Sequence, residues 1–179
     1  MAKFTIIIGC MFSGKSTKIF ELYKKYKKDN KNILLINHQK DTRYGNNVIS
    51  THNKKQLPCF SCLNLKSIAN TNQYNNSNVI MIDEAQFFPD LFDFVTNAID
   101  VDNKEIVIAG LDGDYKRQPF GDILKLIPHS DNIIKLKARC NLCDMENAIF
   151  TKRIVDSNKQ FLVGGSESYI PVCRKHYIS

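Results

Sequence analysis

The chain has 179 residues, of which 43% are hydrophobic and 24% charged, and a formal net charge of +7. This composition indicates a soluble globular protein with one domain, or one domain and a small appendage, and it excludes a membrane-spanning class because no apolar run approaches ~20 residues. The six cysteines, with no apolar signal segment before them, favour free thiols or metal ligands over disulfides. We therefore expect a cytoplasmic protein.

The first element is a short apolar strand that runs into a glycine-rich loop. Residues 4–8 are typical of a buried parallel strand, and the apolar residues at helical spacing that follow are Ile19, Leu22, Tyr23 and Tyr26. The stretch "GCMFSGKS" between them fits G-x-x-x-x-G-K-[ST], in which backbone N–H groups and the helix N-terminus bind phosphates. We expect a nucleoside triphosphate on Gly9, Met11, Phe12, Ser13, Gly14, Lys15, Ser16 and Thr17.

The positive charge is concentrated in the helix that follows this loop. Its densest cluster comprises Lys24, Lys25, Lys27, Lys28 and Lys31. These lysines share the helix with apolar residues, so the simplest interpretation is a solvated face whose stems cover apolar surface. Charge alone therefore gives no reason to expect a nucleic-acid partner.

The rest of the chain alternates between apolar runs and helical patterns. We expect further strands at 33–37, 79–84 and 105–114, a helix at 91–100, weak helical spacing at 57–69, and surface loops at 39–47 and 70–78. Strands with intervening helices call for a parallel sheet with right-handed crossovers. After about residue 135 the pattern changes to short β-like pieces, so we predict an α/β nucleotide-binding domain at 1–134 and a small module at 135–179.

The predicted strand at 79–84 ends in two carboxylates, Asp83 and Glu84. A carboxylate at the carboxyl edge of the sheet faces the first loop, where a magnesium ion must be held. We therefore expect Asp83, together with the hydroxyl of Ser16 in that loop, to bind the magnesium ion. Glu84 next to it suits a general base that takes a proton from an attacking hydroxyl. The alternative is a pair of solvated acids at a strand end.

Paired metal-type residues appear late in the chain. Cys140 and Cys143 form C-x-x-C, and Cys173 and His176 form C-x-x-H. Two tight pairs of soft ligands joined by a loop are what a tetrahedral, structural zinc requires. A competing pair, Cys59 and Cys62, is interpreted more simply as partly buried thiols.

The segments "GCMFSGKST", "DTRYG", "IDEAQFFPD", "LDGDYKRQPFG", "CNLC", "TKR", "GGSESY" and "CRKHY" occur in this order across nearly the whole chain. The series resembles that of the cytosolic-type thymidine kinases of animals, bacteria and large DNA viruses. The resemblance implies a P-loop parallel sheet with a zinc-binding lasso module, and magnesium-dependent transfer of the γ-phosphate of ATP to thymidine, or to deoxyuridine. It also implies a homotetramer and feedback inhibition by dTTP.

The same resemblance gives roles to further residues. It adds Arg43 and Gln86 to the phosphate-binding set, although a lone loop arginine such as Arg43 is usually solvated. It makes the segment 154–169 a lasso that closes over the base, which main-chain groups of the lasso largely read. The nucleoside pocket that it implies comprises Met11, Phe88, Leu111, Tyr115, Phe120, Thr151, Gln160, Leu162, Val163, Gly164 and Tyr169. By default Phe88, Tyr115 and Phe120 are core residues.

Two residues depart from the pattern of many relatives. Cys10 stands where they have proline, and His176 stands where many animal and viral members have a fourth cysteine. Neither change removes a phosphate-binding group or a competent zinc ligand. Two other classes stay open: a zinc-ribbon ATPase that acts on nucleic acid, and a protein that binds nucleotide without turnover.

Overall fold

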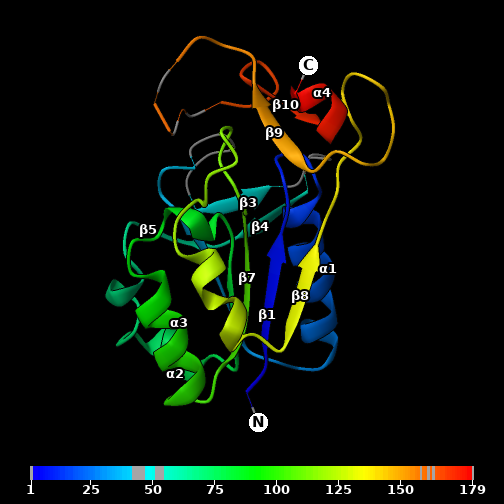
Figure 1. The fold of residues 1–179 in the computed structure, drawn as a ribbon. Helices are drawn as coiled ribbons and strands as arrows, with labels where there is room; N and C mark the ends of the chain where they lie inside the picture. The colour runs from blue at the N-terminus through cyan, green and yellow to red at the C-terminus, as the bar shows by residue number, and fades with distance from the viewer. Residues whose placement is uncertain are drawn as a thin grey trace.

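The computed structural model describes residues 2–41, 47–50, 55–157, 159–160, 162 and 164–178. Its centre is a six-stranded sheet in the order β5-β2-β6-β7-β1-β8 (Figure 1). All neighbouring strands in it are parallel, as the alternating pattern predicts. The strands are β1 (Phe4–Ile8), β2 (Ile33–His38), β5 (Phe60–Cys62), β6 (Val79–Ile82), β7 (Glu105–Gly110) and β8 (Asn132–Lys135).

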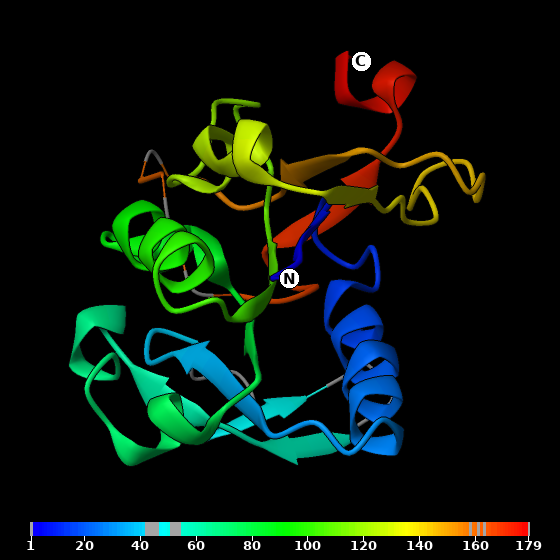
Figure 2. The ribbon, with the colours of Figure 1, turned by 90° about the horizontal axis from the view of Figure 1, so that it is seen from below.

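Each face of the sheet is covered, because successive side chains of a strand point to opposite faces. On one face the core includes Ile6 and Ile108, under α2 (Asn72–Asn76), α3 (Leu91–Asp100) and the 3-10 helices η1 (Leu65–Ser67) and η3 (Ile123–His129). On the other face, Ile7 and Met81 pack under α1 (Lys15–Lys28) and the hairpin of β3 (Val48–Ser50) and β4 (Gln56–Pro58). Figure 2 shows α1 and α3 on opposite sides of the sheet.

The C-terminal part forms a small second layer above the carboxyl ends of the strands (Figure 1). It consists of an antiparallel pair, β9 (Phe150–Arg153) and β10 (Tyr169–Val172), and the short helix α4 (Arg174–Ile178). Cys10 of the glycine-rich loop is buried against Ala138, Cys140 and Ala148 of this layer. The module is therefore packed directly on the loop that follows β1, while Lys135, the first residue assigned to it, still belongs to β8.

The segment 70–78, expected to be a surface loop, instead contains α2, so that expectation is wrong. Thr71 caps this helix by accepting a hydrogen bond from the Tyr74 backbone N–H at 3.2 Å. Tyr74 is buried and donates its hydroxyl to Asp102 at 2.5 Å. The weak helical spacing at 57–69 corresponds to β4, β5 and η1.

The described helices include none that combines the length and the apolar character needed to cross a membrane.

Candidate active site

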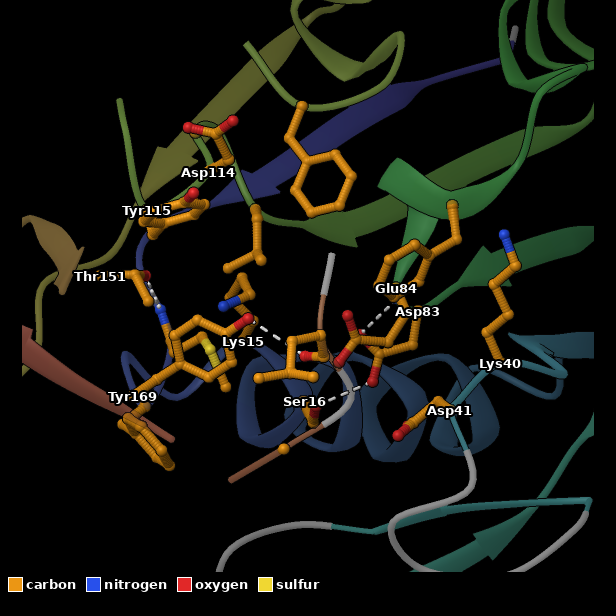
Figure 3. Close-up of a pocket in the computed structure, with 18 of the residues that line it drawn as sticks. Lys15, Ser16, Lys40, Asp41, Asp83, Glu84, Asp114, Tyr115, Thr151 and Tyr169 are labelled. Carbon is orange, nitrogen blue, oxygen red and sulfur yellow. Dashed lines mark hydrogen bonds between the residues drawn. The ribbon is translucent and has the colours of Figure 1, made fainter. Parts of the chain in front are cut away.

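A pocket opens at the carboxyl edge of the sheet, where the loops after β1, β2, β6 and β7 meet the C-terminal module. In the view of Figure 3, Lys15, Ser16, Asp83 and Glu84 lie in its centre. Tyr115, Thr151 and Tyr169 line one side, and Lys40 and Asp41 line the opposite side. The fold therefore gathers acidic, basic and aromatic groups from five segments of the chain around one cavity.

The loop after β1 is shaped by its glycines. Gly14 has φ +85°, a conformation that favours glycine, and begins α1. At Gly9 a Cβ atom would lie 2.6 Å from the Leu136 carbonyl oxygen, so no side chain fits there. Gly9 and Ser13 are buried inside the loop, whereas the loop residues that line the pocket are Met11, Phe12, Gly14, Lys15, Ser16 and Thr17.

Lys15 spans this loop and donates from Nζ to the Cys10 carbonyl oxygen at 2.8 Å. Burial lowers the pKa of its ammonium group, and the nearby Glu84 carboxylate opposes that shift. Lys15 is the first residue of α1 and lines the pocket together with Asp83 and Glu84. A cationic group therefore lies in the same pocket as two acidic side chains. A cation at a helix N-terminus is the arrangement expected for binding phosphate oxygens.

Asp83 and Ser16 form the oxygen-rich part of the pocket. Ser16 Oγ donates to Asp83 Oδ2 at 2.8 Å, and the Glu84 backbone N–H donates to Asp83 Oδ1 at 3.0 Å. Burial, together with the charge of Glu84, raises the pKa of Asp83 to about 6. A carboxylate and a hydroxyl are hard oxygen ligands, so this pair suits a divalent cation, whose charge would favour ionised Asp83.

Glu84 is held in place from two directions. Its backbone adopts φ 52°, a left-handed conformation between β6 and the 3-10 turn η2 (Ala85–Phe87). Gln86 Nε2 donates to Glu84 Oε2 at 2.6 Å, and Gln86 Oε1 accepts from the Leu111 N–H at 3.0 Å. Gln86, expected among the phosphate contacts, is instead a buried amide that fixes the Glu84 carboxylate and does not line the pocket.

The side of the pocket opposite Lys40 is hydrogen-bonded to the loop after β1. Thr151 on β9 accepts a hydrogen bond from the Met11 N–H at 3.0 Å. The expected nucleoside residues that line the pocket are Met11, Leu111, Tyr115, Phe120, Thr151, Gln160, Leu162, Gly164 and Tyr169. Arg43 and Val163 lie outside the described residues.

Phe88, expected to contact the nucleoside, is not among the residues that line the pocket. It is fully buried in the core, with its ring centroid 4.7 Å from that of His38. The neighbouring Phe87 lines the pocket instead and packs edge-on against Phe120 at 5.4 Å. Both adjacent rings lie near His38, whose ring centroid is 5.6 Å from that of Phe87, but of the two only Phe87 lines the pocket. A pattern of two adjacent phenylalanines does not specify which one faces the cavity.

Sequence reasoning also missed polar residues that line the pocket, including Lys40, Asp41, Ser50 and Asp114. Lys40 and Asp41 directly follow β2, so the rule that ligand sites form at the carboxyl ends of parallel strands applies to them as it does to Asp83. Asp114 accepts the Gln160 side-chain amide at 3.0 Å and thereby connects the loop after β7 to the segment after β9.

The four predicted metal ligands converge in the C-terminal module. One ligand atom from each of Cys140, Cys143, Cys173 and His176 lies within 4.8 Å of every other, so the cluster can hold a metal ion. Although burial opposes the shift, hydrogen bonds from the Leu142 and Cys173 N–H groups lower the pKa of Cys140 to about 6. A thiol with this pKa is readily available as a thiolate ligand.

Cys59 and Cys62 lie outside this cluster. Cys59 directly precedes β5, and Cys62 is the last residue of that strand. Burial raises the pKa of both thiols, that of Cys62 to about 11. Within the described part of the chain they join no metal-type cluster. The interpretation of the pair as partly buried thiols stays a prediction.

The comparisons with known proteins agree with this geometry. A family model described as thymidine kinase matches residues 2–177. The chain is 44% identical over 177 residues to a thymidine kinase of Oryza sativa subsp. japonica, covering 97% of this chain and 65% of that protein. It is 42% identical over 172 residues to the thymidine kinase of Yaba monkey tumor virus (strain VR587), covering 96% of this chain and 92% of that protein. The chain therefore belongs to the thymidine kinase family of enzymes, whose general reaction is phosphoryl transfer from ATP to thymidine.

Proposed function

We propose that this chain phosphorylates thymidine, and deoxyuridine less well, with ATP as donor and with dTMP and ADP as products of the thymidine reaction. The observation that carries the proposal is the single pocket in which Lys15, Asp83 and Glu84 face the aromatic residues Tyr115 and Phe120. Phosphoryl transfer needs a cationic side chain that binds the phosphates and an acidic side chain that coordinates the metal ion. It also needs an acidic side chain that accepts the proton of the attacking hydroxyl, and a surface that binds the acceptor. These groups lie around one cavity.

At the phosphate end, the loop after β1 would hold ATP through its backbone N–H groups and Lys15. Ser16 and Asp83 fit magnesium because they offer a hydroxyl and a carboxylate, already joined at 2.8 Å. When bound, magnesium neutralises charge on the β- and γ-phosphates. Lys15 would supply a further positive charge to the phosphates. Arg43 is proposed to add its guanidinium to the phosphate-binding groups.

At the acceptor end, Glu84 is the proposed general base. As the 5′-oxygen of thymidine bonds to the γ-phosphorus, the bond from that phosphorus to the bridging oxygen breaks and ADP leaves. The proton of the 5′-hydroxyl passes to the Glu84 carboxylate. The 2.6 Å hydrogen bond from Gln86 fixes the orientation of that carboxylate before the substrate arrives.

We further propose that the Cys140, Cys143, Cys173 and His176 cluster holds one structural zinc ion. A metal here would join the turn before β9 to α4, whose Tyr177 donates its hydroxyl to the Tyr115 carbonyl oxygen at 2.7 Å. The cluster is thus mechanically connected to an aromatic residue of the pocket. Its role is to support the module that carries the acceptor side of the site.

Replacing Cys140 with serine is expected to reduce zinc from about one ion per chain to near zero, because a closed four-ligand site depends on each thiolate. The variant should also unfold at a lower temperature, since binding of a structural metal contributes directly to folding. Metal analysis and thermal unfolding measure both effects. Cys62→Ser is the matched control and should keep its zinc; zinc retained without Cys140, or lost without Cys62, would overturn the ligand set.

Lys15→Ala is expected to lower kcat/KM for ATP by roughly 10²- to 10³-fold, because it removes a charge from the phosphates both before and during transfer. Steady-state kinetics at saturating thymidine measure this loss. Lys18→Ala is the control on the same helix, where Lys18 pairs with Glu21 at 2.7 Å on the surface. Equal ATP use by Lys15→Ala and the wild type would refute the phosphate-loop assignment.

The experiment that tests the whole proposal is transfer of labelled γ-phosphate from ATP in the presence of thymidine. Formation of dTMP supports it. ATP hydrolysis stimulated by DNA or RNA but not by nucleosides would instead identify a zinc-ribbon ATPase, and ATP binding without turnover would identify a non-catalytic nucleotide-binding protein. The homotetramer and feedback by dTTP are parts of this proposal that rest on the family resemblance. A cytoplasmic location is also proposed, and it rests on the composition and the cysteines of the sequence.

A further inference from the structure

Arg153, the last residue of β9, is half-buried beside the pocket without lining it. Its guanidinium makes an unusual set of contacts for a residue outside a binding site. Nη1 donates to the Ser157 carbonyl oxygen at 2.8 Å and to that of Lys159 at 2.5 Å. Nη2 donates to the Gln160 carbonyl oxygen at 3.2 Å. One side chain thus binds three main-chain oxygens of the segment that follows β9.

The same guanidinium is also bound to two aromatic residues of the pocket. The guanidinium carbon Cζ lies 3.7 Å from the centroid of the Tyr115 ring, which is close for a cation–π contact. Nη2 donates to the Tyr169 hydroxyl at 2.7 Å, and that hydroxyl donates to the Leu162 carbonyl oxygen at 3.1 Å. Arg153 therefore joins β9, the loop after β7 and the start of β10 through one planar group.

The segment held in this way contributes directly to the cavity. Gln160, Leu162 and Gly164 line the pocket together with Tyr115 and Tyr169. The carbonyl groups of Ser157, Lys159 and Gln160 accept hydrogen bonds from Arg153 and cannot rotate freely, so the orientation of these peptide groups is fixed. A flexible surface segment would otherwise lose conformational entropy each time it closed on a ligand.

We propose that Arg153 is a positioning residue that preorganises the main chain at Ser157, Lys159 and Gln160 for the nucleoside. The inference rests on the proposed function for the identity of the ligand, but not for the contacts themselves. A guanidinium suits this role because its planar fork presents donors in several fixed directions while its face stacks on Tyr115. A lysine ammonium keeps the charge but has neither the fork nor the stacking face.

Arg153→Lys is therefore expected to raise KM for thymidine by roughly 10- to 100-fold, since several hydrogen bonds are lost and the segment must order on binding. KM for ATP should change by less than about threefold, and zinc content should not change, because neither site contacts Arg153. Amide hydrogen exchange, measured without substrates, should accelerate in the peptide covering 154–168 and nowhere in the central sheet.

Chemical rescue separates positioning from a general structural effect. In Arg153→Ala, millimolar methylguanidine is expected to restore part of the affinity for thymidine, whereas methylamine at the same concentration should not. The matched control is Arg174→Lys, which removes another guanidinium of the module, 5.1 Å from the Phe150 ring centroid. That variant should retain wild-type KM for both substrates.

The outcomes distinguish this inference from the proposed function. Unchanged KM for thymidine and unchanged exchange in Arg153→Lys would overturn it, as would an equal rise of both KM values or loss of zinc. If the wild-type protein fails to phosphorylate thymidine, the proposed function falls. In that case the exchange measurement on Arg153→Lys still decides whether the guanidinium orders the segment.

Discussion

Glu84→Gln is expected to lower kcat by roughly 10²- to 10⁴-fold while ATP and thymidine binding stay close to wild type. Glutamine has the shape of glutamate, and its amide oxygen can still accept the hydrogen bond from Gln86 that now measures 2.6 Å. What the variant loses is basicity, so the proton of the acceptor hydroxyl has no carboxylate to receive it. Rapid-quench kinetics of dTMP formation measure the chemical step directly.

The matched control is Glu105→Gln, at the opposite end of a neighbouring strand. Glu105 begins β7 and accepts the Tyr26 hydroxyl at 2.7 Å, away from the carboxyl edge where the pocket lies. This variant should keep kcat within about threefold, because its change lies outside the reacting groups. A near-normal chemical rate in Glu84→Gln would refute Glu84 as the base and direct attention to the other acids that line the pocket, which are Asp41, Asp83 and Asp114.

The fold could be predicted where the sequence carries a strong physical signal. Strands β1, β2, β6 and β7 are largely apolar because both faces of a parallel sheet are covered. The edge strands β5 and β8 were not predicted, since an edge strand is partly exposed and these are only three and four residues long. In the segment 70–78, abundant asparagine concealed a helix held by one capping threonine and one buried tyrosine.

The site was predictable to the extent that its chemistry depends on local spacing. The glycine-rich loop, Asp83 with Glu84, and the two metal pairs follow from residues close in sequence, and the structure brings each set together. The choice between Phe87 and Phe88 depends instead on the left-handed turn at Glu84. The proposed role of Arg153 depends on contacts with three separate segments of the chain. Such contacts cannot be predicted from the spacing of residues in a single sequence.

The acceptor side of the pocket has features that favour strong discrimination between bases. Apolar and aromatic side chains such as Leu111 and Phe120 give shape, while hydrogen bonds to a base are proposed to come from main-chain groups of the segment after β9. That main chain is held by Arg153 and Tyr169, so its donors and acceptors cannot rearrange easily to suit another ligand. A fixed set of main-chain groups matches one pattern of base edges and leaves buried groups unpaired against another.

We therefore expect kcat/KM for deoxycytidine to be about 10⁴-fold below that for thymidine, because its exocyclic amine replaces a carbonyl at the recognised edge. Deoxyuridine lacks only a methyl group, which an apolar niche distinguishes by roughly 10-fold, and the purine deoxynucleosides should be nearly inert because their edges do not match the same main-chain groups. Competition assays with all four deoxynucleosides and deoxyuridine at fixed ATP measure these ratios. Comparable kcat/KM for deoxycytidine and thymidine would show that the main chain after β9 does not read the base, and the enzyme would then be a deoxynucleoside kinase of broad specificity.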